Sequence, residues 1–156
     1  MPGYPVIRLP HLLACLLLWT HALAQEPPPA QSSRVFCEQS VSYRLADKAQ
    51  VPERFRRFVG VWSDAAWGVG SCAALIVENV RPDATASIVY VYGPLGSNGA
   101  GPGGVLHGTG VIRNGELLFQ NSDGSQFAFR LGIVDLQGRL TTPKGRTFTA
   151  IFKQTP

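Results

Sequence analysis

Between Gly60 and the end of the chain, apolar and polar residues alternate in short runs that end at turn-forming residues. The alternation is clearest where four apolar side chains share one face, namely Phe127, Phe129, Leu131 and Ile133. A period of two is typical of a β-strand that buries one face against a core and exposes the other. The pattern predicts eight strands, at residues 60–66, 73–80, 85–92, 106–112, 116–121, 126–134, 139–142 and 147–153.

The connections between these strands are too short to contain crossover helices. Asn114-Gly115 and Asp123-Gly124 are strong signals for tight hairpins, because these residue types accept the positive φ values that such turns require. Further turns are predicted at Pro82-Asp83, Gln137-Gly138 and Lys144-Gly145. Consecutive strands joined in this way run antiparallel, and closing the sheet removes its exposed edges. The fold class expected is therefore all-β, an antiparallel up-and-down barrel of about eight strands.

The segment before the first strand follows a helical period. Val51, Phe55 and Phe58 recur at helical spacing, and Pro52 suits the first position of a helix. We expect one short N-terminal helix there, packed as a plug. The domain organisation expected is a Pro-rich linker over 25–35, an N-terminal arm with the short helix over 36–58, and a β-barrel domain over 59–156.

Residues 1–24 have the pattern of a secretory signal peptide. One charge, Arg8, precedes an apolar core at residues 12–19 that is shorter than the roughly 20 residues of a membrane span. Residues 22–24 read Ala-Leu-Ala, a small-x-small cleavage site. We expect a periplasmic or secreted protein whose mature form begins at Gln25. The alternatives are an N-terminal anchor that is never cleaved and a lipoprotein attached through Cys15.

Cleavage leaves two cysteines, Cys37 and Cys72, which we expect to form a disulfide bond in an oxidising compartment. Closing this loop contributes about 3–4 kcal/mol of stability in the chain-entropy model. The alternative is a redox or metal-binding thiol pair. That reading is opposed by the absence of a C-x-x-C motif and by the single histidine, His107, that remains after cleavage. No metal and no cofactor are therefore expected.

The charge of the chain is mild, with 14 basic and 10 acidic residues and a net charge of +4. Arg54, Arg56 and Arg57 form the one tight basic group, and a solvated face explains this group better than a nucleic-acid contact. We expect no nucleic-acid partner. No later segment is long and apolar enough to stop transfer, so no stable membrane insertion is expected either.

The order of elements resembles a known superfamily. A short amphipathic helix that leads into Gly60-Val61-Trp62, followed by a meander of about eight strands, resembles the calycins, which include lipocalins and fatty-acid-binding proteins. The resemblance covers roughly residues 54–153. It implies that Trp62 packs at the closed end of the barrel, and that a basic residue on the last strand, here Lys153, covers it. Residues 75–93 also look similar to a poorly described group of small exported bacterial proteins.

One connection differs from the tight turns. Residues 93–104 read GPLGSNGAGPGG, with six glycines in twelve residues. The segment lacks the Gly-Lys-Ser/Thr of a P-loop, and a strand rather than a helix follows it, so phosphate or dinucleotide binding is not indicated. It is interpreted either as a mobile surface loop or as a lid at the mouth of the barrel.

Two functions of different classes fit these observations. In the first, an exported soluble module binds a small apolar or sugar-like ligand at the barrel mouth, and the residues expected to line the site are Trp67, Tyr90, Tyr92 and His107. In the second, aromatic rings fill the barrel, and the protein is a structural or protein-interaction module of the cell envelope. The rings expected inside are Phe119, Phe127, Phe129, Phe148 and Phe152. No catalytic constellation is recognisable, and we do not expect an enzyme.

Overall fold

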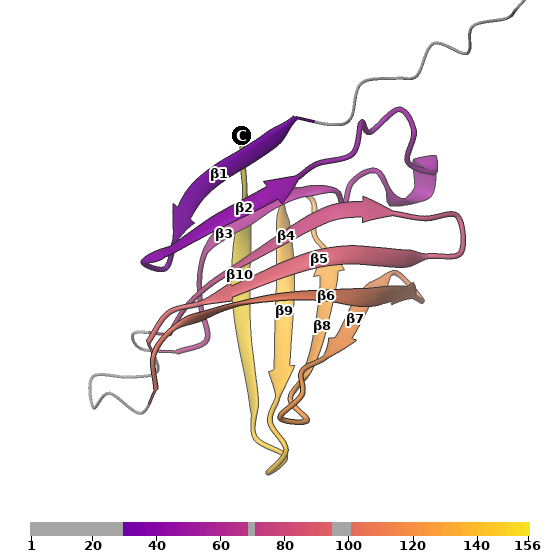
Figure 1. Cartoon of the computed structure of the whole chain (residues 1–156). Helices are drawn as coiled ribbons and strands as arrows, with labels where there is room; N and C mark the ends of the chain where they lie inside the picture. The colour runs from indigo at the N-terminus through magenta and orange to yellow at the C-terminus, as the bar shows by residue number, and fades with distance from the viewer. Residues whose placement is uncertain (1–29, 69–70, 95–100) are drawn as a thin grey trace, which may run out of the picture.

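The computed structural model describes residues 30–68, 71–94 and 101–156. Within these residues, two strands form a separate hairpin and eight strands form a closed barrel (Figure 1). The expected signal peptide lies outside the described residues, as do residues 25–29 of the expected linker. Residues 95–100 of the glycine-rich connection also lie outside them.

The barrel strands follow one another in chain order, and each is antiparallel to its neighbours. The ring closes where the last strand pairs with the first. Its members are β3 (Gly60–Ala66), β4 (Cys72–Val80), β5 (Thr85–Tyr92), β6 (Gly104–Arg113), β7 (Glu116–Gln120), β8 (Gln126–Leu131), β9 (Asp135–Thr141) and β10 (Thr147–Thr155). The expected all-β, closed antiparallel barrel of eight strands is confirmed, and it is consistent with a calycin-like barrel.

One connection lies elsewhere than predicted, because β8 ends early and the turn to β9 is formed by residues 132–134. Ile133 is therefore 93% exposed instead of lying on the core face. The predicted turn at Gly138 was wrong, since this glycine lies inside β9. A Cβ atom there would lie 2.7 Å from the Trp67 ring and 2.8 Å from the Phe152 ring, so the glycine is required by packing.

Aromatic rings fill the interior of the barrel. Phe129 and Phe152 are completely buried, and Phe119 and Phe127 are 7% and 5% exposed. The stacked rings of Phe119 and Phe127 have centroids 4.5 Å apart. Phe148 is half-buried and packs against the same core. The interior is thus a close-packed core rather than a lumen.

The predicted short helix is replaced by a single 3₁₀ turn, η1 (Glu53–Phe55), and no α-helix forms there. The backbone N–H of Phe55 donates to the carbonyl of Pro52 at 2.8 Å, and that of Phe58 donates to the carbonyl of Phe55 at 2.9 Å. Because β3 begins almost at once, too few residues are left to nucleate an α-helix. Val51, Phe55 and Phe58 are nevertheless buried in the barrel core, as their spacing predicted.

Ahead of η1, a β-hairpin lies across the outside of the barrel. It consists of β1 (Gln31–Phe36) and β2 (Gln39–Arg44), and β1 begins inside the segment that was expected to be a linker. Val41 and Tyr43 on β2 are buried in a second core, outside the barrel. The barrel contributes outward-facing side chains to this core, namely Val61, Ala74, Ile76, Val89 and Val91.

The hairpin is held by the predicted disulfide bond. Cys37 and Cys72 are bonded, with their Cα atoms 5.6 Å apart, which joins the hairpin turn to the first residue of β4. Cys37 and Glu38 have φ values of 50° and 65°, so they form a two-residue turn of the type that suits a tight hairpin. The bridge lies against Gly93, where an added Cβ would be 3.2 Å from that of Cys72. A disulfide in this position indicates an oxidising compartment.

Candidate functional site

Three of the four residues expected at the barrel mouth lie together. The indole N–H of Trp67 donates to the hydroxyl of Tyr90 at 2.6 Å, and both side chains are buried. Tyr90 stacks on the half-buried ring of Tyr92, with centroids 6.1 Å apart. Burial raises the pKa of the Tyr90 hydroxyl well above its ordinary value, so this group stays neutral.

Trp67 closes the space in which a ligand was expected. The residue follows the end of β3, and its ring turns inward to pack edge-on against Phe152, with centroids 5.6 Å apart. It makes similar contacts with Phe127 and Phe129, at 6.1 and 6.2 Å. The indole is therefore an integral part of the aromatic core at this end of the barrel.

His107 does not join these rings. It is exposed on β6 and lies opposite Val89 on β5. Val89 belongs to the outer core and Tyr90 to the inner core, because successive side chains of a strand point to opposite faces. His107 thus lies on the outer face of the barrel wall, and the aromatic cluster lies inside.

The two residues named from the calycin resemblance are also separated. Trp62 is buried in the barrel core, and its indole N–H donates to the carbonyl of Phe58 at 2.9 Å, next to η1. Lys153 is exposed and lies opposite Ser63, whereas Gln154 lies opposite Trp62. Since Phe152 points inward, Lys153 points outward and does not cover Trp62.

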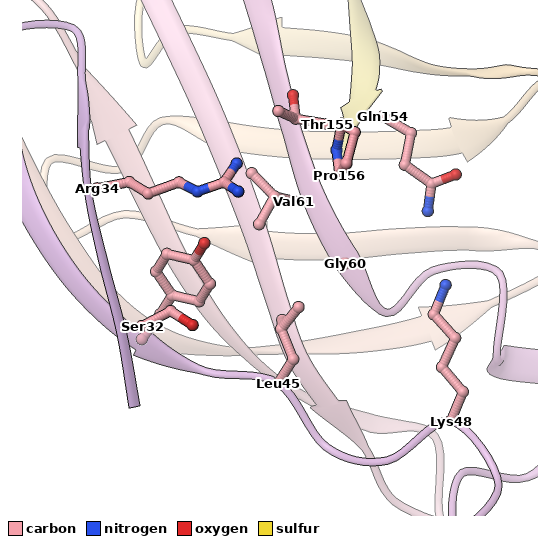
Figure 2. Close-up of a pocket in the computed structure, with 10 residues that line it drawn as sticks. Ser32, Arg34, Leu45, Lys48, Gly60, Val61, Gln154, Thr155 and Pro156 are labelled. Atoms are coloured by element: carbon pink, nitrogen blue, oxygen red, sulfur yellow. The ribbon is translucent and has the colours of Figure 1, made fainter. Parts of the chain in front are cut away.

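A groove of about 470 Å³ lies between the hairpin and the line where β3 meets β10 (Figure 2). Four segments contribute to it: the hairpin, the connection after it, the start of β3 and the end of β10. The residues that line it are Ser32, Arg34, Tyr43, Leu45, Lys48, Gly60, Val61, Gln154, Thr155 and Pro156. None of these was among the residues predicted for a site.

Among the side chains that line the groove, two are cationic and none is acidic. Arg34 and Lys48 are both exposed, and no ion pair or side-chain hydrogen bond involves either of them within the part of the chain that is described. No Asp or Glu side chain lines the groove. Figure 2 shows the two cations on either side of the apolar floor, which includes Leu45 and Val61.

One edge of the hairpin is free beside this groove. β1 pairs with β2 alone among the described strands, and residues 31–35 are all exposed. The side chains of Ser32 and Arg34, two residues apart on one strand, both line the groove. β1 therefore presents alternate side chains to the groove and a row of unpaired backbone groups at its outer edge.

A second hollow, of about 330 Å³, lies over β7, β8 and β9 and shares no lining residue with the groove. Leu118, Ala128 and Arg139 are among the residues that line it. It combines one cation with a continuous sheet surface, and each of the three strands has neighbours on both sides. The groove under the hairpin differs in having both an unmatched pair of cations and a free strand edge.

The described residues contain neither a metal-binding cluster nor a membrane-spanning helix. Within residues 30–68, 71–94 and 101–156, no group of three His, Cys, Asp or Glu side chains is placed to hold a metal ion. No helix among these residues has the length and apolar character needed to cross a membrane. Comparison of the chain with protein-family models, with curated proteins and with solved structures gives no match in any of the three.

Proposed function

We propose that this protein is an exported protein-interaction module in which the filled barrel is a rigid scaffold and the groove under the hairpin is the contact surface. The observation that supports this proposal is the packing of the barrel interior. Trp67 and Tyr90 add their rings to those of Phe119, Phe127, Phe129 and Phe152. A small-molecule site of about 300 Å³ or more would require several of these rings to move together.

The outer core supports the same proposal. The hairpin covers one part of the wall and leaves a groove at its margin, so the surface there is shaped by two elements, the hairpin and the barrel wall. The disulfide bond fixes the hairpin turn to β4, which reduces the conformational entropy that a partner must overcome on binding. Export through the predicted signal peptide would allow this bond to form.

Native mass spectrometry combined with site-specific crosslinking tests the proposal. The oxidised protein, purified without denaturant from cells that export it, is expected to have the mass of the polypeptide alone. A photoreactive residue at Ser32 in the groove is expected to capture a polypeptide partner. The same residue at Thr149, exposed on β10, provides the matched control and is expected to capture none. Equal capture from both positions would contradict the proposal.

A small-ligand site at the aromatic end of the barrel is the second candidate. It is favoured by Tyr92, whose ring is half-buried and stacks on Tyr90. The same mass spectrum distinguishes the two candidates. A retained small molecule that is lost in Trp67→Ala would favour the aromatic end and count against the interaction module.

A further inference from the structure

We infer that the groove binds an extended acidic segment of a partner protein, which adds as a third strand along the free edge of β1 and places its carboxylates on Arg34 and Lys48. This inference rests on the proposed function and names the chemistry of the partner. It is carried by three observations: the unmatched cations, the free edge and the apolar floor between the cations.

The cations determine the sign of the partner's charge. Arg34 extends from β1 and Lys48 from the connection after β2, and neither has an acidic partner among the described residues. A guanidinium group offers a planar fork of donors that matches a carboxylate, and such charge-assisted hydrogen bonds are stronger than neutral ones. An acidic segment would satisfy both groups, whereas a basic segment would meet like charges.

The free edge determines the backbone conformation of the partner. Residues 31–36 contain no proline, and no described strand covers their outer edge. In a two-residue hairpin the pair that flanks the turn, Phe36 and Gln39, is hydrogen-bonded, and the pairs then alternate. Ser33 and Ser42 therefore form a non-hydrogen-bonded pair, and their backbone groups point away from each other. An added strand would pair with the outward groups of Ser33.

The floor determines the spacing of the partner's side chains. Figure 2 shows Val61 and Leu45 between the two cations. Side chains of an added strand point alternately into the groove and to solvent. Positions i, i+2 and i+4 of an added strand share one face, so the groove is expected to select two acidic residues four positions apart, with an apolar residue midway between them.

Selection from a displayed library of random nonapeptides on the oxidised full chain tests the charge and the spacing. We expect enrichment of acidic residues four positions apart, with an apolar residue midway between them. For the most enriched peptide, measured by fluorescence anisotropy, Arg34→Gln is expected to weaken binding about tenfold or more, because a charge-assisted hydrogen bond is lost. Lys48→Gln should act in the same direction. Arg113→Gln, at the end of β6, is the control and should have no effect.

Failure to enrich any peptide would overturn the inference, and so would enriched peptides without an acidic bias or binding that is indifferent to Arg34→Gln. Vesicles of phosphatidylglycerol form a second arm of the experiment. Binding to these vesicles in place of peptides would assign the cations to a lipid surface and would also overturn it.

A proline substitution on each edge of the hairpin tests strand addition. Ser33→Pro removes an outward N–H from the edge at the groove, and Ser42→Pro removes the equivalent N–H from the opposite edge. We expect Ser33→Pro to abolish peptide binding and Ser42→Pro to leave it unchanged. If Ser33→Pro alters the melting temperature, N-methylation of alternate peptide residues replaces it. Peptide binding that persists both in Ser33→Pro and after N-methylation of the peptide would exclude the addition of a third strand.

These outcomes separate the inference from the function on which it rests. A partner captured at Ser32 by crosslinking, together with no acidic preference in the library, would leave the interaction module in place and reject the acidic strand. Capture that fails from Ser32 while a small molecule is retained would reject both.

Discussion

The strands of the barrel wall differ in whether one or both faces are buried, as a comparison of β4 with β8 shows. In β8 the alternate residues Phe127 and Phe129 are buried, and the other residues face solvent or are half-buried. In β4 five consecutive residues, 73–77, are buried, because the inner core covers one face and the hairpin covers the other. A continuous apolar run therefore marks the part of the wall that another element covers. The groove lies at the margin of the hairpin that covers this part of the wall.

The largest effect is expected inside the barrel. Phe129→Ala removes a completely buried ring that contacts Phe119 and Phe152. We expect a loss of about 3–5 kcal/mol in the free energy of unfolding, measured by urea denaturation, because the rigid wall cannot close the cavity. Phe148→Ala, at a half-buried ring, should cost clearly less. If the two variants lost equal free energy of unfolding, the interior of the barrel would not be the dominant core.

Removing the disulfide bond should loosen the outer core selectively. Cys37→Ser with Cys72→Ser is expected to lower the free energy of unfolding by about 3–4 kcal/mol in the chain-entropy model. Before that comparison, mass spectrometry of the alkylated protein with and without reductant checks that the bridge is formed. If two thiols are alkylated without reductant, the hairpin is held by packing alone.

A matched pair of conservative substitutions compares the two cores directly. Ile76 faces the hairpin and Ile88 faces the barrel interior, and both are buried. Each Ile→Val change is expected to cost about 0.5–1.5 kcal/mol. In the variant that lacks the disulfide bond, the cost of Ile76→Val should shrink while that of Ile88→Val is unchanged. Equal behaviour of the two positions would mean that the cores open together.

The smallest effect concerns the hydrogen bond between the Trp67 indole and the Tyr90 hydroxyl. Tyr90→Phe removes the acceptor and should cost about 1 kcal/mol. Burial raises the pKa of Tyr90 in the folded protein, so the unfolded chain ionises first as the pH rises above the ordinary value of 10.0. The wild-type protein should therefore lose stability above that pH more steeply than Tyr90→Phe. Parallel curves would contradict the buried, neutral hydroxyl.

The barrel could be predicted from the sequence because its turns contain residue types that are typical of tight hairpins. Asn114 and Gly115 both have positive φ values, as their hairpin turn requires. The hairpin was missed because its turn is formed by Cys37 and Glu38, which give no such signal and owe their conformation to the bridge and the outer core. The alternation of apolar residues from Val41 to Leu45 was the sequence signal that could have revealed β2.

The candidate site could not be predicted from the sequence, for a different reason. The groove exists only because the hairpin overlies the junction of two strands that are distant in sequence. Arg34 and Thr155 line the same groove from opposite ends of the described chain. The mouth predicted from Tyr90 and His107 assumed an open barrel end. The inward turn of Trp67 depends on space among rings from two other strands, β8 and β10, which no local pattern describes.

The junction beneath the groove also governs how the barrel opens. β10 shares seven residue pairs with β9 but only three with β3, and the hydroxyls of Ser63 and Thr155 lie 2.6 Å apart across it. β6 and β7 also share only three residue pairs, but a two-residue turn joins these two strands directly. Partial opening should therefore begin at the junction of β3 and β10, which has few backbone bonds and no connecting turn. Val61 and Thr155 belong to its two sides and to the lining of the groove. A partner bound in the groove would contact both strands and thus stabilise the closed barrel. Its binding should slow amide hydrogen exchange at the start of β3.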